Sequence, residues 1–370
     1  MTATATTDPA ERLRRKRSTR AVQVVVVAVV LVAVFAFALP KVADYGSVWA
    51  VVTMLTWPQV ALLVAATAVN VVTYWSQMVA SLPGLTIGQA AVNNQTSTSV
   101  ANTVPGGGVL AIGVACLMFR SWGFTAGPIA LSVLLTGIWN TMLKLALPIL
   151  AVVLLALTGS GNGALLVPAL VGLAALTATV AGFGLLTWRR EFARQVGGRL
   201  GAAVSWLRRL VRRPPVIGWG DAAVRFRGQS NDLVARRWLA LTITTAVSHL
   251  SLYVVFLLTV RVVGISGAEV SWAEVLGIFA LGRLLSAAPI TPGGLGVVEL
   301  TYIAGLVLAG GGEIRAEAVA AALLFRLLTY GVQIPLGGIT YLVWQRKTSW
   351  RSPLQPQPPA VLAPARVPAW

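Results

Sequence analysis

The sequence predicts an all-α integral membrane protein with six long spans and two shorter helical hairpins, each interrupted by Pro-Gly-Gly. Three observations lead to this fold class. Of the 370 residues, 56% are hydrophobic and 11% are charged, whereas an average soluble domain has about 25% charged residues. Several apolar runs exceed the roughly 18 residues typical of a membrane-spanning helix. The charged residues gather in blocks outside these runs.

The long apolar runs are the predicted spans, and they cover residues 21–39, 58–80, 128–157, 164–187, 238–260 and 317–344. The first run contains Ala36-Phe37-Ala38, which loosely resembles a signal-peptide cleavage site. Because the run is long for a signal peptide, we expect an uncleaved anchor, with a cleaved signal as the alternative.

Two interrupted regions between the long runs predict the hairpins. In the first, a polar stretch at 88–102 leads through Pro105-Gly106-Gly107 to a short apolar piece at 109–119. The second, at 272–310, has apolar pieces on either side of Pro292-Gly293-Gly294. Proline and adjacent glycines end a helix, so each region predicts two short helices joined by a break.

Basic blocks divide the chain into five regions. A basic tail (1–20), an Arg-rich loop (188–237) and a Pro-rich basic tail (346–370) flank two membrane halves, 21–187 and 238–345. Because basic segments stay in the cytoplasm, we expect the loop and both termini there. This charge pattern explains the net charge of +18 without a nucleic-acid partner.

The Arg-rich loop leaves two interpretations open. Its segment 191–213 mixes apolar residues with arginines, as an amphipathic helix on an anionic leaflet does. An ordinary solvated basic loop is the alternative.

The two membrane halves contain a weak internal repeat. Pro292-Gly293-Gly294 follows Pro105-Gly106-Gly107 by 187 residues, and Pro335 follows Pro148 by the same distance. Thr67-Ala68-Val69-Asn70 resembles the segment at 245–248, and repeat one covers about 58–157. With the basic segments in the cytoplasm, the spans at 58–80 and 238–260 run in opposite directions. Inverted repeats with broken helices are typical of transporters.

The breaks leave backbone N–H and C=O groups free, which cannot face hydrocarbon. We therefore expect the breaks to line a cavity, and the alternative is a tight structural turn. The residues concerned are Pro105, Gly106, Gly107, Pro292, Gly293, Gly294 and Gly296.

Four ionisable residues interrupt apolar segments: Lys144, Arg283, Glu299 and Arg326. Charges within a membrane usually face a bundle interior or a water-filled site. The last three would form a net positive site suited to a phosphate group, or a structural Glu–Arg pair. Lys144 is solitary in the sequence, and both snorkelling and a polar cavity remain open for it.

Residue types used in catalysis are scarce. The chain has one cysteine, Cys116, and one histidine, His249, so metal sites and Ser-His-Asp triads have almost no candidates. We expect no enzymatic activity and no cofactor, and we interpret His249 as a packed helix residue.

The second break resembles a known family. Residues 291–300 read TPGGLGVVEL, and residues 323–330 read LLFRLLTY. Together these motifs resemble the lysylphosphatidylglycerol synthase transmembrane-region family, over about residues 20–345. That family resembles the flippase-type membrane domain of bacterial multiple peptide resistance factors, and it implies handling of aminoacylated or polyprenyl-linked lipids. The residues that match the motifs are Pro292, Gly293, Gly294, Gly296, Glu299, Arg326 and Tyr330.

The first repeat departs from the family pattern, which has Pro-Gly-Arg followed by a Gly-Glu pair. Asn102 and Pro105-Gly106 are present, but glycine replaces the arginine, and no acid follows before Arg120. Since no synthetase domain follows residue 345, we expect no aminoacylation of lipid by this chain.

These observations favour a lipid flippase of the bacterial inner membrane that moves an anionic, aminoacylated or polyprenyl-linked lipid. Two alternatives remain: a secondary transporter of a small anion, and a non-transporting partner of a lipid-modifying enzyme. The expected substrate-binding residues are Arg283, Glu299, Arg326, Tyr330 and Asn102.

Overall fold

The structure is a computed structural model, and it describes residues 45–103, 107–159, 166–210, 214–215, 218–286, 294 and 296–352. This part of the chain is helical and contains no strand. Five helices within it are long and apolar enough to cross a membrane, and they confirm five of the six predicted spans. The sixth predicted span, residues 21–39, lies outside the described residues.

The first half starts with α2 (Tyr45–Met54) and α3 (Trp57–Ser81), followed by α4 (Ile87–Thr103), α5 (Gly107–Ser121) and α6 (Ala126–Thr158). Local signals set the ends of these helices. Thr56 and Gln59 form a capping box at the start of α3. Gly159, with φ +71, ends α6 in the left-handed conformation that favours glycine.

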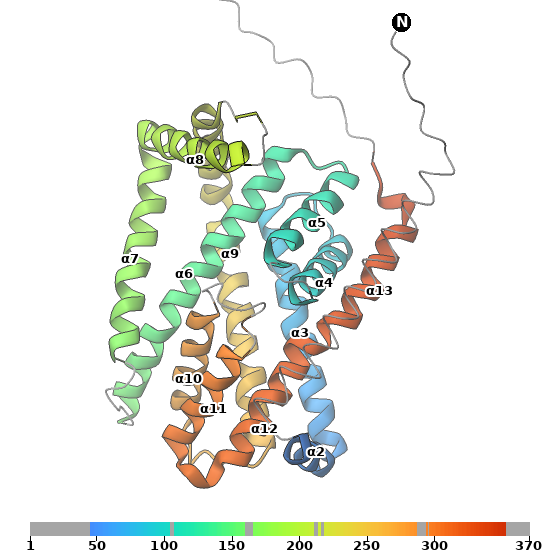
Figure 1. The fold of residues 1–370 in the computed structure, drawn as a ribbon, viewed down its shortest axis with the longest axis vertical. Coiled ribbons are helices and arrows are strands. Elements are labelled where there is room, and N and C mark those ends of the chain that lie inside the picture. Colours follow the sequence, from blue (N-terminus) through green and yellow to red (C-terminus); the bar gives the residue numbers. More distant parts are fainter. Residues whose placement is uncertain are drawn as a thin grey trace, which may run out of the picture.

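The connection between the halves is helical. It contains α7 (Leu166–Trp188), α8 (Arg190–Leu210) and α9 (Trp219–Val262). The predicted span 238–260 is thus the membrane part of a helix that starts much earlier. Helix α8 lies across one end of the bundle (Figure 1), and Gly197 and Gly201 let it pack closely on Trp219 at the start of α9. Of the two interpretations left open for 191–213, the structure therefore favours a helix, Arg190–Leu210; residues 211–213 lie outside the described residues.

The second half comprises α10 (Trp272–Leu285), α11 (Val297–Gly310), the 3-10 turn Gly312–Ile314, α12 (Arg315–Arg326) and α13 (Gln333–Arg346), with a final 3-10 turn at Thr348–Trp350. A π-helical segment, Leu327–Gly331, joins α12 to α13, and the Val332 N–H donates to the Leu327 carbonyl at 2.9 Å. The predicted span 317–344 is continuous but not uniformly α-helical.

The two hairpins lie in opposite halves of the bundle. The α4–α5 hairpin is in the half nearer α8, and the α10–α11 hairpin is in the half farther from it (Figure 1). Their helices have 14 to 17 residues, or about 21–26 Å at 1.5 Å per residue. This is shorter than the roughly 30 Å of a bilayer core.

Packing between the halves is reciprocal. Helix α3 runs along α9, α4 packs on α13, and α10 packs on α6. An aromatic cluster forms the core of the second half, where the Phe256 ring lies 4.4 Å from Tyr302 and 5.1 Å from Phe325. The first hairpin has its own apolar core around Met118 and Phe119.

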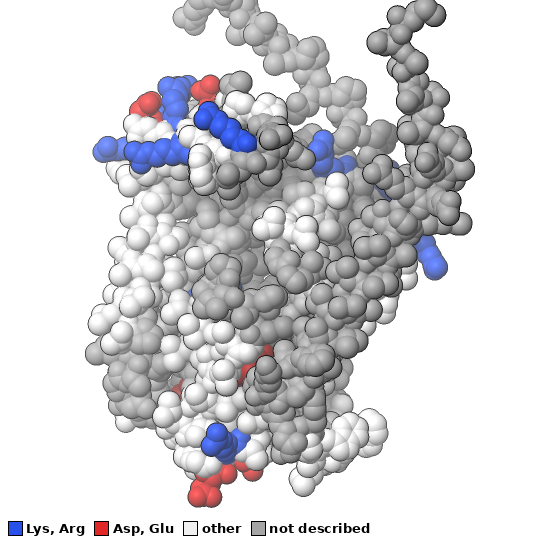
Figure 2. All heavy atoms as spheres, viewed as in Figure 1, with Lys and Arg blue, Asp and Glu red and all other residues white. Residues whose placement is uncertain are grey.

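Charged side chains gather at the two ends of the bundle. Arginines gather on α8 at one end (Figure 2). The connections at the opposite end also carry acids, including Glu269 and Glu313. Between these ends, the described surface is mainly apolar, as a lipid-facing surface requires.

Candidate functional site

A cavity of about 370 Å³ lies between the two halves, and the described helices α3, α4, α6, α9, α10, α11, α12 and α13 and the π segment all contribute to its wall. Its lining residues are Asn70, Tyr74, Asn94, Thr98, Asn102, Lys144, Leu252, Arg283, Ser286, Val298, Tyr302, Phe325, Arg326, Thr329, Tyr330 and Gln333. A larger hollow of about 480 Å³ lies between α8 and the start of α9, away from the predicted site residues.

The cavity lies halfway along the spans. Asn70 is near the middle of α3, Lys144 near the middle of α6, and Arg326 near the middle of the helix that runs from 312 to 346. Polar and charged side chains at this depth are costly unless they face protein or a polar cavity. The positions of these side chains on the cavity wall meet that condition.

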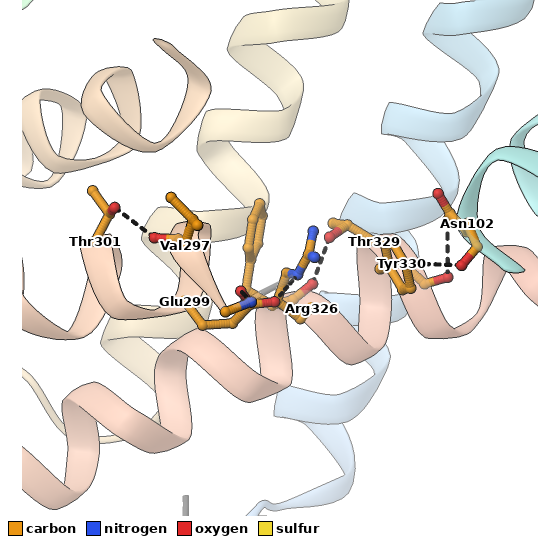
Figure 3. Close-up of polar contacts among 9 residues, drawn as sticks. Asn102, Val297, Glu299, Thr301, Arg326, Thr329 and Tyr330 are labelled. Atoms are coloured by element: carbon orange, nitrogen blue, oxygen red, sulfur yellow. Dashed lines mark hydrogen bonds and ion pairs between the residues drawn. The ribbon is translucent and has the colours of Figure 1, made fainter. Parts of the chain in front are cut away.

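Glu299 and Arg326 form an ion pair beside the cavity, as one interpretation of the sequence predicted (Figure 3). Glu299 is only 2% exposed. Its second carboxylate oxygen accepts the Gly296 N–H at 2.7 Å. Gly296 has φ +83, which glycine adopts without strain, and it starts α11 so that Glu299 lies in the first turn. Glu299 therefore positions Arg326 and does not itself line the cavity.

Arg326 also connects the pair to the first hairpin. Its guanidinium lies over the Tyr330 ring, 4.5 Å from the centroid. The Tyr330 hydroxyl donates to the Asn102 carbonyl, and the Asn102 amide donates to the Tyr330 carbonyl at 3.4 Å (Figure 3). Four of the five predicted substrate-binding residues thus line one cavity, and the fifth, Glu299, holds one of them.

Arg283 lines the cavity at the end of α10. Its Nε is buried without a hydrogen-bond partner among the described residues. Lys144, which looked solitary in the sequence, reaches the same cavity from α6 because α10 packs on that helix. The sequence signal that could have found this role is the repeat itself, which places the helix after one hairpin beside the other hairpin.

The polar stretch of the first hairpin serves two purposes. Asn94, Thr98 and Asn102 are spaced by four residues, so they share one face of α4, and all three line the cavity. Others hold the helix in place: the Asn93 amide donates to the Ala115 carbonyl at 3.1 Å, and the Ser99 hydroxyl to the Ile334 carbonyl at 3.1 Å. The sequence alone did not separate these two groups.

The described break residues include Gly107, which begins α5, and Gly296, which caps the start of α11. A Cβ on Gly107 would lie 2.6 Å from the Val100 and Ala101 carbonyl oxygens. Gly294 has φ +71. Gly107, Gly294 and Gly296 are not among the lining residues. Pro105, Gly106, Pro292 and Gly293, which were expected at the breaks, lie outside the described residues.

His249 is buried, and its Nε2 lies 3.1 Å from the Asn140 Oδ1, as expected for a packed helix residue. No group of three or more His, Cys, Asp or Glu side chains that could hold a metal occurs within the described part of the chain.

A family model described as the lysylphosphatidylglycerol synthase TM region matches residues 21–337 of this chain. The match covers most of the chain and includes every predicted substrate-binding residue. No curated protein matches the chain.

Proposed function

The chain belongs to the lysylphosphatidylglycerol synthase TM region family, and on that premise we propose that it is a lipid translocase of the bacterial inner membrane. The lipid head group enters the cavity between the two halves, and the acyl chains stay in the bilayer. The observation that carries this proposal is the charge of the cavity wall. Lys144, Arg283 and Arg326 reach it from three different helices at mid-membrane depth.

The halves act as inverted repeats. Asn70 and Ser248 hold matching positions in the two repeats, 178 residues apart, and the Asn70 amide donates to the Ser248 carbonyl at 3.0 Å. Thr73 and Ser251, with the same separation, have hydroxyl oxygens 3.4 Å apart. Equivalent residues touch each other where a two-fold axis passes between two copies. These contacts support such an axis between α3 and α9.

Two further observations support this symmetry. The α4–α13 contact and the α10–α6 contact are equivalent, because each joins the first helix of one hairpin to the long span that follows the other hairpin. Each hairpin is too short to cross the bilayer and lies in its own half of the bundle (Figure 1). We therefore treat both hairpins as re-entrant, one from each side; Asn102 and Ser286, described residues next to the two breaks, line the cavity.

The basic end of the bundle faces the cytoplasm, by the positive-inside rule. Arginine-rich α8 then lies flat on the inner leaflet, where its apolar face and its arginines suit an anionic surface. Both chain termini are cytoplasmic in this orientation.

Transport follows from movement of one half against the other, which opens the cavity to each leaflet in turn. The chain performs no covalent step in this scheme. Either an ion gradient drives the movement or the lipid moves down its own gradient.

A liposome assay tests the proposal. Purified protein is reconstituted with fluorescent anionic, zwitterionic and lysyl-modified phospholipids in both leaflets, and the outer leaflet is then reduced chemically. We expect reduction well beyond half of the label for at least one lipid. Arg283→Gln should return reduction to half, whereas Arg120→Gln should not, because Arg120 is exposed at the basic end.

Two outcomes would count against lipid translocation. The first is that half of the label on every lipid stays protected from reduction in liposomes that contain folded protein, both with and without an imposed proton gradient. The second is uptake of a water-soluble anion by the same liposomes while all lipids stay protected. That result would favour a small-anion transporter.

A further inference from the structure

We propose that the cavity selects a head group in which a phosphate is linked to a neutral, hydroxyl-rich group, and that it rejects aminoacylated head groups. The inference rests on the proposed function, because it concerns the substrate of the same cavity. It also departs from the family's description, which refers to a lysyl-modified lipid.

The first argument is the charge balance of the wall. Lys144, Arg283 and Arg326 line the cavity, and no Asp or Glu is among the lining residues. Glu299, the ion-pair partner of Arg326, has both carboxylate oxygens engaged: one binds Arg326 and the other accepts the Gly296 N–H. A buried cation requires an opposite charge or several hydrogen-bond acceptors. The described wall therefore offers no free carboxylate for the ammonium groups of a lysyl head group.

The second argument concerns the cationic groups themselves. Arg283 brings a guanidinium to the wall with its Nε buried and without a hydrogen-bond partner among the described residues. An unpaired buried donor is costly, and a phosphate oxygen would satisfy it. A guanidinium binds phosphate with charge-assisted hydrogen bonds, so Arg283 and Lys144 are well suited to this group.

The third argument is the length of the neutral wall, the uncharged part of the cavity lining that Asn94, Thr98 and Asn102 of α4 form. From Asn102 to Asn94, α4 advances eight residues, or about 12 Å. This is longer than a phosphate alone. The phosphate end of the cavity lies near Asn102, because Tyr330 joins Asn102 to the Arg326 side chain. The wall then extends along α4 past Thr98 toward the basic end of the bundle.

Polar side chains on this neutral wall are available to a ligand. The side chains of Tyr74, Asn94 and Thr98 line the cavity and make no hydrogen bond to another described residue. Gln333 presents a buried amide oxygen that also lacks a partner within the described chain. Hydroxyls and amides both donate and accept hydrogen bonds, as recognition of several hydroxyl groups requires. Glycerol, inositol and sugar head groups have this chemistry, whereas a bare phosphate lacks it.

Binding measurements on the purified full-length protein test the inference without relying on transport. Short-chain phosphatidylinositol, phosphatidylglycerol, phosphatidic acid and lysyl-phosphatidylglycerol are titrated while thermal unfolding is followed. We expect phosphatidylinositol to bind most tightly. Phosphatidic acid should bind at least about fivefold more weakly than phosphatidylinositol, as the loss of one or two hydrogen bonds predicts. Lysyl-phosphatidylglycerol should bind at least tenfold more weakly than phosphatidylglycerol.

Variants separate the two parts of the wall. Thr98→Ala should weaken phosphatidylinositol to the level of phosphatidic acid and leave phosphatidic acid unchanged. Ser97→Ala is the matched control, because Ser97 bonds to its own helix and is not a lining residue. Arg283→Gln should weaken every phosphate lipid, and Arg120→Gln none.

The outcomes distinguish the two proposals. Equal binding of lysyl-phosphatidylglycerol and phosphatidylglycerol would overturn the inference, as would equal effects of Thr98→Ala on phosphatidylinositol and phosphatidic acid. If water-soluble inositol phosphate binds as tightly as phosphatidylinositol and no lipid is translocated, the head-group selectivity stands and the lipid translocase proposal fails.

Discussion

The two hairpins share an architecture and differ in chemistry. The α4–α5 hairpin contributes the neutral side chains of Asn94, Thr98 and Asn102 to the cavity, whereas the α10–α11 hairpin contributes Arg283 and positions Arg326 through Glu299. The two hairpins therefore supply different parts of one cavity wall. Similar helix packing therefore does not require similar polar side chains. Each hairpin provides different hydrogen-bond and ion-pair partners for its buried polar atoms.

The hairpins also differ in how their partners hold them. Helix α4 packs on α13 so closely that a Cβ on Gly337 would lie 2.1 Å from the Ser99 Cβ. Within the second hairpin, a Cβ on Gly282 would lie 2.2 Å from the buried Tyr302 ring. The first hairpin is thus tightest against the opposite half, and the second is tightest between its own two helices. The four predictions below test this comparison.

The largest expected effect is on the buried ion pair of the second hairpin. Glu299→Ala removes the carboxylate partner of Arg326 and should lower the free energy of unfolding by about 3–5 kcal/mol, since breaking a buried pair leaves a charge uncompensated. Thermal unfolding in detergent measures the loss. Glu313→Gln is the control, because Glu313 is exposed at the end of the bundle. A loss similar to that of the control would show that the pair does not support the hairpin.

The next effect concerns close packing. Gly282→Ala and Gly337→Ala should each cost about 1–3 kcal/mol, because the added methyl group forces its neighbours apart. Gly338 has open space around its Cα, so Gly338→Ala should instead be neutral or stabilise by up to about 1 kcal/mol. Thermal unfolding of the three variants gives the comparison. If Gly337→Ala matches Gly338→Ala, the close contact between α4 and α13 is absent.

A smaller effect is expected at the link between the hairpins. Tyr330→Phe removes the hydroxyl that donates to the Asn102 carbonyl and should cost about 1 kcal/mol, the usual net contribution of one hydrogen bond. The ring remains available for Arg326. Hydrogen exchange of the α4 backbone should rise near Thr103 and stay unchanged in α10. Equal rises in both helices would indicate general loosening and contradict a local link.

The smallest effect on stability is expected at Arg283. No salt bridge joins its guanidinium to a carboxylate of the described residues, so Arg283→Gln removes a partly buried charge that no described carboxylate balances and should leave the melting temperature equal or higher. Lipid translocation should nevertheless be lost in the liposome assay. A large drop in melting temperature would show that Arg283 supports the fold, and the charged wall would then lose its main binding group.

Sequence patterns predicted the spans and hairpins because bilayer thickness and helix-breaking residues leave clear marks in a chain. They also placed Arg283, Arg326, Tyr330 and Asn102 in one site. Lys144 was noted as an ionisable residue within an apolar run, but its place in the cavity was left open, because that place depends on the packing of α10 on α6, which only the weak repeat indicates. The whole length of α9 was missed for a related reason. Its first residues are polar and charged, and packing against α8 supports them as a helix.

The π-helical segment has a consequence for the two ends of the helix that contains it. An α-helix turns about 100° per residue, and the segment Leu327–Gly331 contains one residue more than an α-helical turn would hold. Upstream, α12 packs with the second hairpin; downstream, α13 packs with the first. The extra residue therefore sets the rotation of α13 relative to α12 about the helix axis. Deleting it would rotate Gly337 away from α4 by about 100° and leave Arg326 facing Glu299, so the two hairpins would no longer be joined in register.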